Sequence, residues 1–335
     1  MSTKGEFAIS TNEGPVRIRG WICLCILLLG FPLTSCNQPA TGTPATKTSI
    51  TSPVGQGQDR QHTTPTIQSI VKSTPAVTPA HYTSHVVLKG VGRPDDLAFD
   101  QQGQLLFSDE INDTISRINA DGTVSLVLKD VNGPEGLVVR PDGTIIFAEQ
   151  NTNRIVSLAP GSQNPTVLRT LPGTPSNAQC KHGVDGIAFD ATTGTLIVPD
   201  SPTGDVYRMS LDGKMFTKLA SGIVRPVGAG VDSQGTIFVA DECGNAIWSI
   251  TAKGQTTKIG GFGMPDDVLP DGYGNVLVID LDPAIHSLIR LNLATGKRET
   301  LASEGYIEPQ GLAIDGHQNV FVSDDFANII VEYTP

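Results

Sequence analysis

Short runs of alternating apolar and polar residues fill the chain from residue 85 onward, and Gly, Asn or Asp bounds each run. The stretch from Arg93 to Val131 contains four such runs in succession, with turns at Gly103 and at Asp121-Gly122. Alternation with a period of two between turn residues is typical of half-buried strands. The stretch therefore predicts a four-stranded antiparallel meander.

The same pattern recurs along the chain, so that the first copy is one of six. Successive copies start 39 to 50 residues apart, a spacing within or near the period of a propeller blade. The six copies begin at Pro94, Pro134, Val184, Pro226, Pro265 and Pro309. We expect an all-β, six-bladed β-propeller with four antiparallel strands in each blade.

The two ends of the repeat region predict how the ring closes. The last copy stops after its third strand, at Ile329 to Tyr333, and lacks a fourth. A spare strand precedes the first copy, where Val86 to Val91 matches Val127 to Val131. We expect this N-terminal strand to complete the last blade, because closure removes the exposed edge of an open sheet.

The N-terminal 35 residues have the pattern of a signal peptide. Arg17 and Arg19 precede an apolar run from Trp21 to Leu33, which is short for a permanent membrane span but suits a signal. The run ends in Leu33-Thr34-Ser35-Cys36, which resembles a bacterial lipobox. It predicts cleavage before Cys36, lipidation of its thiol and an extracytoplasmic, membrane-anchored protein. The alternative is an ordinary secretory signal followed by an incidental Cys.

Residues 36–84 are rich in Thr, Pro, Ser, Gln and Gly. Such a composition cannot bury enough apolar surface to offset the entropy of ordering, and it predicts a disordered tether. The propeller then occupies residues 85–335. The formal charge of the chain is −11, to which the signal contributes +1 and the tether +2, so the propeller carries −14. This charge argues against nucleic acid or anionic lipid as a partner and is compatible with cations; we expect a monomer.

The repeat resembles a known family. Pro-x-Gly/Asp-Leu-Ala-x-Asp, followed by Leu-x-Phe-x-Asp-x-x-x-Asn/Asp-x-Ile, is similar to the NHL-type repeat. It is also similar to the six-bladed group that contains gluconolactonase (senescence marker protein, luciferin-regenerating enzyme) and streptogramin B lyase. The resemblance covers the whole predicted domain, and it implies a fold much more specifically than an activity.

Two sets of polar residues are expected on the face that carries the loops between blades. The first set is an acid at the end of each second strand: Asp109, Glu149, Asp200, Asp241, Asp280 and Asp324. Because all six copies have it, we favour a structural role, in which each carboxylate accepts N–H bonds from its own strand-to-strand loop. Direct ligand binding by one of them is the alternative.

The second set varies between the copies, at the position just before the Gly/Asp of the repeat in each loop that leads into a blade. It consists of Asp95, Glu135, Asp185, Val227, Asp266 and Gln310. Four carboxylates around one cavity cannot all stay ionised unless a cation or a shared proton relieves them. Oxygen ligands without sulfur suit Ca²⁺ or Mg²⁺. The alternative is a wide, wet channel with solvated acids.

The family resemblance implies roles for some of these residues. Asp266 falls at the position of a metal-binding Asp that is also the general base, and Asp95 stands where a Glu ligand is expected. Val227 replaces an Asn ligand and cannot coordinate a metal. Either Asp185 or Glu135 substitutes for it, or the lactonase site is absent. The resemblance implies a metal-dependent lactonase or ester hydrolase at the channel mouth.

Two other functions stay open. One is a non-enzymatic propeller that binds a small molecule or a protein at its mouth. The other, less favoured, is a lyase similar to streptogramin lyase, because Gln310 stands where that enzyme has a His and no Glu/His pair replaces it. Gln310, His182 and His286 are candidate substrate-binding residues, although both histidines are isolated in the sequence.

Two cysteines are expected in the folded domain. Cys180 precedes blade three and Cys243 follows the second strand of blade four, on the same predicted face. An oxidising compartment favours a disulfide between them, provided that they lie close together. Two separate buried thiols are the alternative.

Overall fold

The computed structural model of the protein describes residues 82–335. The predicted signal peptide, the lipidation site at Cys36 and nearly all of the predicted tether lie outside these residues, so they stay predictions. The first strand begins at Thr83, two residues before the predicted domain boundary. Within the described residues no helix is long and apolar enough to span a membrane.

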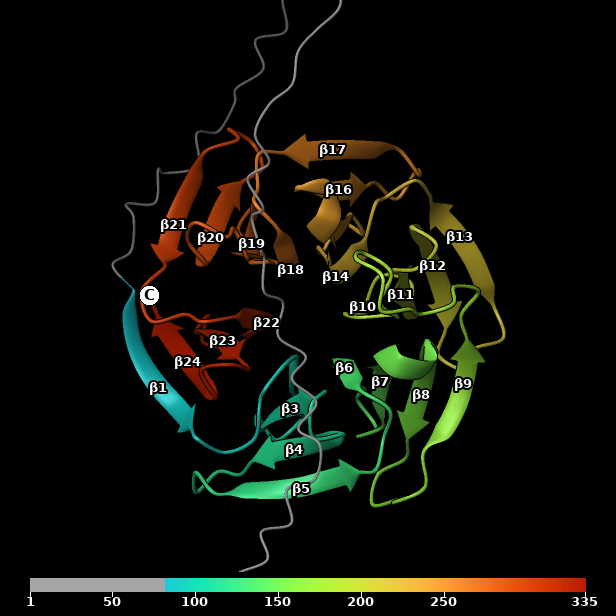
Figure 1. Cartoon of the computed structure of the whole chain (residues 1–335), viewed down its shortest axis with the longest axis vertical. Helices are drawn as coiled ribbons and strands as arrows, with labels where there is room; N and C mark the ends of the chain where they lie inside the picture. Colours follow the sequence, from blue (N-terminus) through green and yellow to red (C-terminus); the bar gives the residue numbers. More distant parts are fainter. Residues whose placement is uncertain (1–81) are drawn as a thin grey trace, which may run out of the picture. The chain divides into compact units, whose positions relative to one another are not determined.

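Residues 82–335 fold into six four-stranded antiparallel sheets arranged around a central axis, as Figure 1 shows. The first three blades comprise β2 (Leu97–Phe99), β3 (Leu105–Asp109), β4 (Thr114–Ile118) and β5 (Val124–Lys129); β6 (Pro134–Val139), β7 (Ile145–Glu149), β8 (Arg154–Leu158) and β9 (Thr166–Thr170); and β10 (Ala188–Asp190), β11 (Thr195–Asp200), β12 (Asp205–Ser210) and β13 (Phe216–Ala220). The predicted six-bladed propeller is confirmed.

The other three blades follow the same order, from the innermost strand outward. They comprise β14 (Pro226–Val231), β15 (Ile237–Asp241), β16 (Ala246–Ile250) and β17 (Thr256–Gly260); β18 (Pro265–Pro270), β19 (Asn275–Asp280), β20 (Ser287–Asn292) and β21 (Arg298–Ala302); and β22 (Pro309–Ile314), β23 (Val320–Asp324), β24 (Ile329–Thr334) and β1 (Thr83–Lys89). Two 3₁₀ turns, η1 (Gln150–Thr152) and η2 (Glu242–Gly244), follow the second strands of blades two and four.

The N-terminal strand closes the ring as predicted. β1 pairs antiparallel with β24, with Val86 opposite Val331 and Leu88 opposite Ile330. Leu88 is buried, and it lies in one cluster with Ile330 of blade six and Phe107 of blade one. Burial of such a side chain contributes roughly 1.5–3 kcal/mol. The strand therefore both completes a sheet and joins the last blade to the first.

The hydrophobic core lies between neighbouring blades. Leu106 and Ile115 of blade one pack with Phe147 of blade two, for example. The described residues form six such clusters, one at each junction between adjacent blades. The alternating pattern of the sequence thus fills every interface around the ring.

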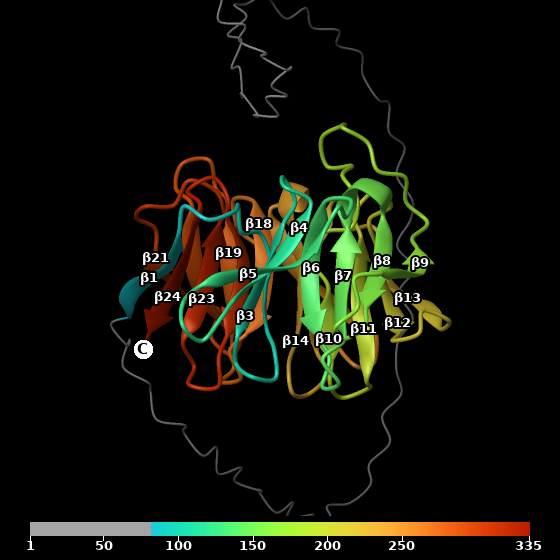
Figure 2. The ribbon, with the colours of Figure 1, turned by 90° about the horizontal axis from the view of Figure 1, so that it is seen from below.

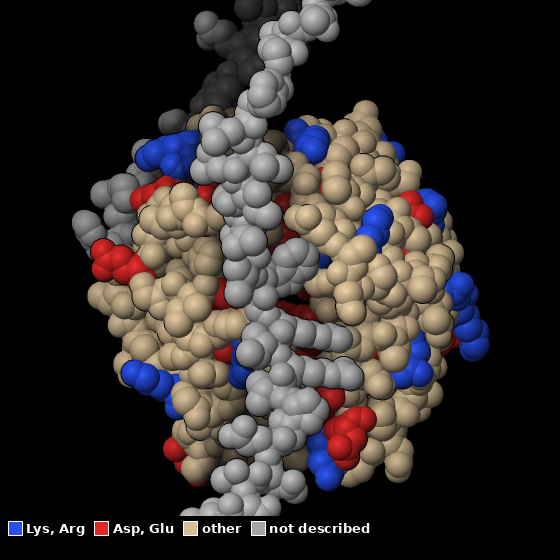
Figure 3. All heavy atoms as spheres, viewed as in Figure 1, with Lys and Arg blue, Asp and Glu red and all other residues tan. Residues whose placement is uncertain are grey.

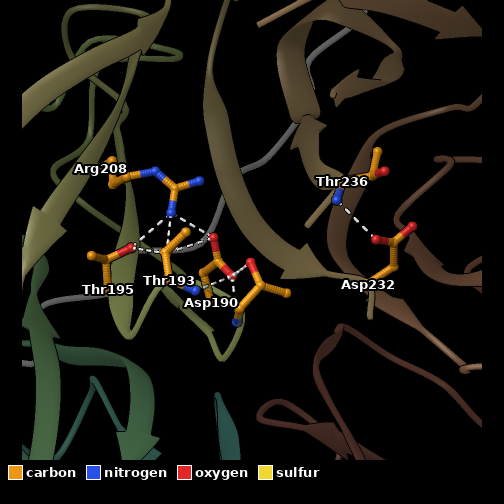
Figure 4. A network of polar contacts seen from close by, with 7 residues as sticks. Asp190, Thr193, Thr195, Arg208, Asp232 and Thr236 are labelled. Atoms are coloured by element: carbon orange, nitrogen blue, oxygen red, sulfur yellow. Dashed lines mark hydrogen bonds and ion pairs between the residues drawn. The ribbon is translucent and has the colours of Figure 1, made fainter. Parts of the chain in front are cut away.

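The turns between the first and second strands are held by aspartates. Asp232 accepts a hydrogen bond from the Thr236 backbone at 2.8 Å, and in the equivalent turn of blade three Asp190 contacts both Thr193 and Arg208 (Figure 4). Burial raises the pKa of Asp190, but the hydrogen bonds from Thr192 and Arg208 outweigh it and hold the pKa near 2. These polar networks are structural, and they lie on the face opposite to the candidate site.

Candidate functional site

One face of the ring carries the loops on which chemistry is expected. These are the loop that leads from the outer strand of one blade into the next, called here the leading loop, and the loop between the second and third strands of each blade. Figure 2 shows the strands running between two loop-bearing faces, with the loop between β9 and β10 projecting furthest from one of them. That face is the channel mouth.

The acids at the ends of the second strands have a structural role, as predicted. Asp109 accepts N–H bonds from Arg93 at 2.7 Å and from Asn112 at 2.9 Å. In all six blades the acid binds the backbone of its leading loop. Only in blades one and six does the acid also accept a backbone N–H from its own strand-to-strand loop. The strand-to-strand loop was thus only part of the predicted contact. Each acid mainly binds the leading loop and holds it against its blade.

A β-bulge shapes the second set of positions. In four blades the pairing of the two inner strands shifts by one residue directly after the leading loop, for example between Pro226 and Ala229 and between Pro265 and Val268. A bulge re-aims the side chains that it contains. The variable residues Glu135, Val227, Asp266 and Gln310 lie in these bulges.

A cavity of about 200 Å³ lies at the mouth of the channel. Its polar lining consists of five aspartates and one amide: Asp95, Asp96, Asp185, Asp266, Asp267 and Gln310. Figure 3 shows acidic side chains gathered around the centre of the ring. Four of the six predicted mouth positions therefore converge on one cavity.

Asp95 and Glu135 form a carboxyl pair. Burial raises the pKa of Asp95 well above its ordinary value, and a hydrogen bond from Glu135 opposes this rise. Burial also raises the pKa of Glu135, and the neighbouring charges of Asp95 and Asp185 raise it further. Two carboxyl groups at hydrogen-bond distance hold one proton between them. The shared proton belongs to the pair and relieves the repulsion between its two carboxyl groups.

Asp185 is paired with a cation. Arg225 Nη2 lies 3.0 Å from Asp185 Oδ2, and its Nη1 forms an ion pair with Glu242. Gln150 Nε2 donates to Glu135 Oε1 at 2.7 Å and lies 3.5 Å from Asp185 Oδ2. Burial raises the pKa of Asp185 and the guanidinium of Arg225 lowers it. Arg225 thus supplies a fixed positive charge beside the acids.

Asp266 has a different environment from the other acids. Its side chain is only 8% exposed and borders the cavity. No hydrogen bond or ion pair to its carboxylate is found among residues 82–335. Burial and the charge of Asp185 raise the pKa of Asp266, and Arg225 opposes this rise. Its carboxyl oxygens are therefore available to water or a ligand.

Asp96 and Asp267 were missed as site residues. Each carboxylate accepts the N–H of the residue that follows it and a second N–H from the neighbouring blade, at Leu137 and Leu312. Burial raises the pKa of both, that of Asp96 to about 7. The other four copies have a glycine here, so an alignment of the copies could have revealed both aspartates.

The remaining predicted residues contribute unequally. Gln310 borders the cavity, whereas Val227 is fully buried in the core between blades four and five. His182 and His286 do not border the cavity; they lie near Asp185 and Glu308, whose pKa values they lower. Arg225 and Gln150, which sequence reasoning missed, contact the acids directly.

The predicted disulfide is confirmed. Cys180 and Cys243 are bonded, with their Cα atoms 6.1 Å apart. The bond joins the long leading loop of blade three to η2 of blade four. Because Glu242 of η2 contacts Arg225, the disulfide fixes one wall of the mouth beside the ion pairs.

The predicted divalent cation was to be held by Asp95, Glu135, Asp185 and Asp266. Within residues 82–335 no three His, Cys, Asp or Glu side chains are grouped so that they could hold a metal ion. Asp95 is engaged with Glu135, and Asp185 with Arg225. In this arrangement the side chains do not fit a metal site, although their oxygen chemistry suits Ca²⁺ or Mg²⁺. The cation stays a prediction.

Comparison with known proteins confirms the family resemblance. The family model of the SMP-30/gluconolactonase/LRE-like region matches residues 78–227. A comparison with curated proteins gives no match. Residues 78–227 are therefore similar to this family, and the fold of residues 82–335 is a six-bladed β-propeller.

Solved structures share the fold at low identity. A gluconolactonase from Xanthomonas campestris is 15% identical, with a TM-score of 0.62 over 76% of this chain and 89% of that chain. A catalytically inactive virginiamycin B lyase from Staphylococcus aureus, solved with quinupristin, is 16% identical, with a TM-score of 0.57 over 76% and 99%. A PQQ-bound aldose sugar dehydrogenase from Streptomyces coelicolor is 17% identical, with a TM-score of 0.57 over 77% and 99%. These likenesses show the fold and leave the activity open.

Proposed function

We propose that this gluconolactonase-like propeller hydrolyses a lactone or another carboxylic ester at its channel mouth. The observation that carries the proposal is Asp266, a carboxyl that borders the cavity and makes no hydrogen bond to another described residue. Structural aspartates of this fold, such as Asp109 and Asp190, use their oxygens on backbone and side-chain donors. Asp266 does not, so it is free to act on water.

Asp266 is the general base of the proposed reaction. Its ionised carboxylate takes a proton from a water molecule while the water oxygen bonds to the carbonyl carbon of the ester. The carbon–oxygen bond to the leaving alkoxide then breaks. Burial raises the pKa of Asp266, and a base of raised pKa is a stronger proton acceptor once it is ionised.

The carboxyl pair supplies the general acid. Glu135 donates a hydrogen bond to Asp95, and Asp95 borders the cavity. The shared proton passes through Asp95 to the leaving alkoxide, which becomes the alcohol. Arg225 acts as a positioning residue, because it pairs with Asp185 and Asp185 contacts the Gln150 amide that binds Glu135.

The proposal predicts a loss of activity in Asp266→Asn. The amide keeps the size of the side chain but cannot accept the proton, and removal of a general base costs about 10²–10⁴-fold in rate. We expect kcat/KM for γ-butyrolactone or an aryl acetate to fall by at least about 100-fold, with a melting temperature no lower than that of the wild type.

The matched control is Asp130→Asn, the same change at an exposed carboxyl of the leading loop of blade two. It should keep full activity. Wild-type-like hydrolysis by a folded Asp266→Asn variant, or no hydrolysis of any lactone or ester by the wild type, would overturn the proposed function.

The proposed location is extracytoplasmic, with a lipid anchor on Cys36. The Cys180–Cys243 disulfide supports an oxidising compartment. Metabolic labelling with a fatty-acid analogue tests the anchor: incorporation should vanish in Cys36→Ser, and absence of label in the wild type would contradict it.

A further inference from the structure

We propose that the ligand of this mouth carries a protonated amine attached to an apolar body, which makes the substrate class a cationic ester or lactone. The proposal rests on the proposed function for the ester, whereas the recognition of the amine stands on the cavity itself. Three features carry it: the charge of the lining, the carboxylate of Asp266, and the apolar side chains around the opening.

The charge of the cavity is not balanced by the protein. Five aspartates line it, and among the described residues no Lys, Arg or His does. The two arginines closest to the mouth are already paired, Arg225 with Asp185 and Glu242, and Arg93 with Asp325. One shared proton relieves the Asp95–Glu135 pair. Asp266 is left without a compensating partner.

Asp266 is the second, independent feature. Its side chain is more than nine-tenths buried, borders the cavity and has no hydrogen-bond donor among residues 82–335. A buried carboxylate without donors is costly, by about 1–3 kcal/mol or more. An ammonium group offers three donors and one positive charge. It needs only one or two carboxylates, whereas a metal site needs a group of ligands that this cavity does not assemble.

The rim of the mouth supplies the apolar contact. Large apolar side chains stand exposed on the loops of blades five, six and one, which also bear Asp266, Gln310 and Asp95. They are Val91, Ile111, Ile285, Ile307 and Phe326, between 42% and 56% exposed. These loops form the rim on the mouth face, and their exposed apolar side chains can contact the body of a bound ligand. The acidic lining and the apolar rim match an amine with a hydrophobic body.

The size of the cavity agrees with this arrangement. About 200 Å³ is more than the roughly 150 Å³ that holds a benzene molecule, but less than most sites that enclose a whole drug-sized ligand. The cavity can therefore take the ammonium group with part of the apolar body, and the rest of the body contacts the rim. Phe326 is partly occupied there, because the Arg93 guanidinium lies 4.2 Å from its ring centre.

Calorimetry with two probes of equal shape tests the recognition of the amine. Phenethylammonium carries both features, and 2-phenylethanol lacks the charge. We expect phenethylammonium to bind at least about 10-fold more tightly, with an affinity that falls as salt rises. Equal affinity for both probes, or no binding of the amine to the folded protein, would overturn the proposal.

Variants separate the contribution of the Asp266 charge from that of the apolar rim. Asp266→Asn should remove most of the preference for the amine, and Ile307→Ser should weaken both probes alike. Leu126→Ser is the control, because this exposed leucine lies on β5, away from the mouth. If Asp266→Asn kept the full preference, or if Leu126→Ser weakened binding as much as Ile307→Ser, the assignment would be wrong.

A matched substrate pair separates this proposal from the proposed function. Phenylalanine methyl ester and methyl 3-phenylpropanoate differ only in the amine. We expect kcat/KM to be at least about 10-fold higher for the first. Equal hydrolysis of both would overturn the amine proposal and leave the hydrolase intact. Binding of phenethylammonium without hydrolysis of either ester would overturn the proposed hydrolase and leave the recognition of the amine intact.

Discussion

At the scale of single residues, the mouth holds more carboxyl groups than its charge balance permits, and different carboxyls are relieved in different ways. Asp95 and Glu135 share a proton, Asp185 faces Arg225, and Asp96 accepts two backbone N–H groups. Asp266 has none of these partners. This inequality, and not the number of acids, is what singles out one residue for chemistry.

Asp325 does not line the cavity, but its pKa tests whether burial and neighbouring charges act on the acids of this face. Burial and the charge of Glu308 raise its pKa to about 7, although Arg93 opposes the shift. The folded protein therefore binds more protons than the unfolded chain between about pH 4 and 7. Stability falls wherever the folded state binds more protons and the pH rises. We expect the contribution of Asp325 to be lost as the pH rises through 7.

Thermal unfolding of Asp325→Asn checks this sign. The wild type should lose melting temperature between about pH 4 and 7, and the variant should lose less, by about 2 °C or more. Asp130→Asn, at an exposed carboxyl, should follow the wild-type curve. A variant with an unchanged or steeper pH dependence would show that the pKa of Asp325 is not raised.

How much of the site could be predicted depended on the kind of residue. Asp95, Asp185, Asp266 and Gln310 were found because copies of a repeat place equivalent residues around one axis. Arg225 was missed because it lies one residue before Pro226, the predicted start of blade four, and outside the aligned positions. Its side chain reaches Asp185. Val227 looked like a mouth residue by position, but its apolar side chain turns into the core.

At the scale of elements, the strands were predicted well where turn residues bound them on both sides. The start of β24 at Ile329 matches the predicted run. The starts of blades one and three were placed too early, since their inner strands begin at Leu97 and Ala188. In blade one Asp95 and Asp96 still form backbone hydrogen bonds with Ser108 of β3, although they lie outside β2. Pro and Asp are depleted in strands, so propensity disfavours a start at Pro94.

The closing strand carries a prediction of its own. Deletion of residues 1–89 would remove β1, expose the edge of β24 and uncover Ile330, which Leu88 now covers. Open sheet edges pair with other chains. We expect the truncated protein to melt at a lower temperature and to aggregate, as measured by light scattering during heating. The control is deletion of residues 1–81, which leaves all of β1 in place. If the protein without residues 1–89 were as soluble and heat-resistant as this control, closure of the ring by β1 would be contradicted.

At the scale of the whole molecule, one ring brings residues from blades that are far apart in the sequence to a single axis. Asp95 and Asp266 are 171 positions apart in the chain, yet they border the same cavity. The same geometry lets a scaffold keep its strands while its mouth changes, so that relatives with one fold have unrelated activities. The predicted divalent cation must be judged at this scale, since its ligands would come from four blades.

A divalent cation and the shared proton should compete for the mouth. Carboxylates must lose their protons before they bind a metal, so metal affinity rises with pH. At low pH the Asp95–Glu135 pair keeps its proton, and the cluster has less charge to offer. The acids as arranged do not form a metal site, so a cation would have to displace the shared proton and regroup them. If it does, millimolar Ca²⁺ will raise the melting temperature by about 2 °C or more near pH 8 and leave it unchanged near pH 5. Asp95→Asn should abolish this gain and Asp130→Asn should keep it. No shift at either pH would remove the cation from the site, and an equal shift at both would show that it does not displace the proton.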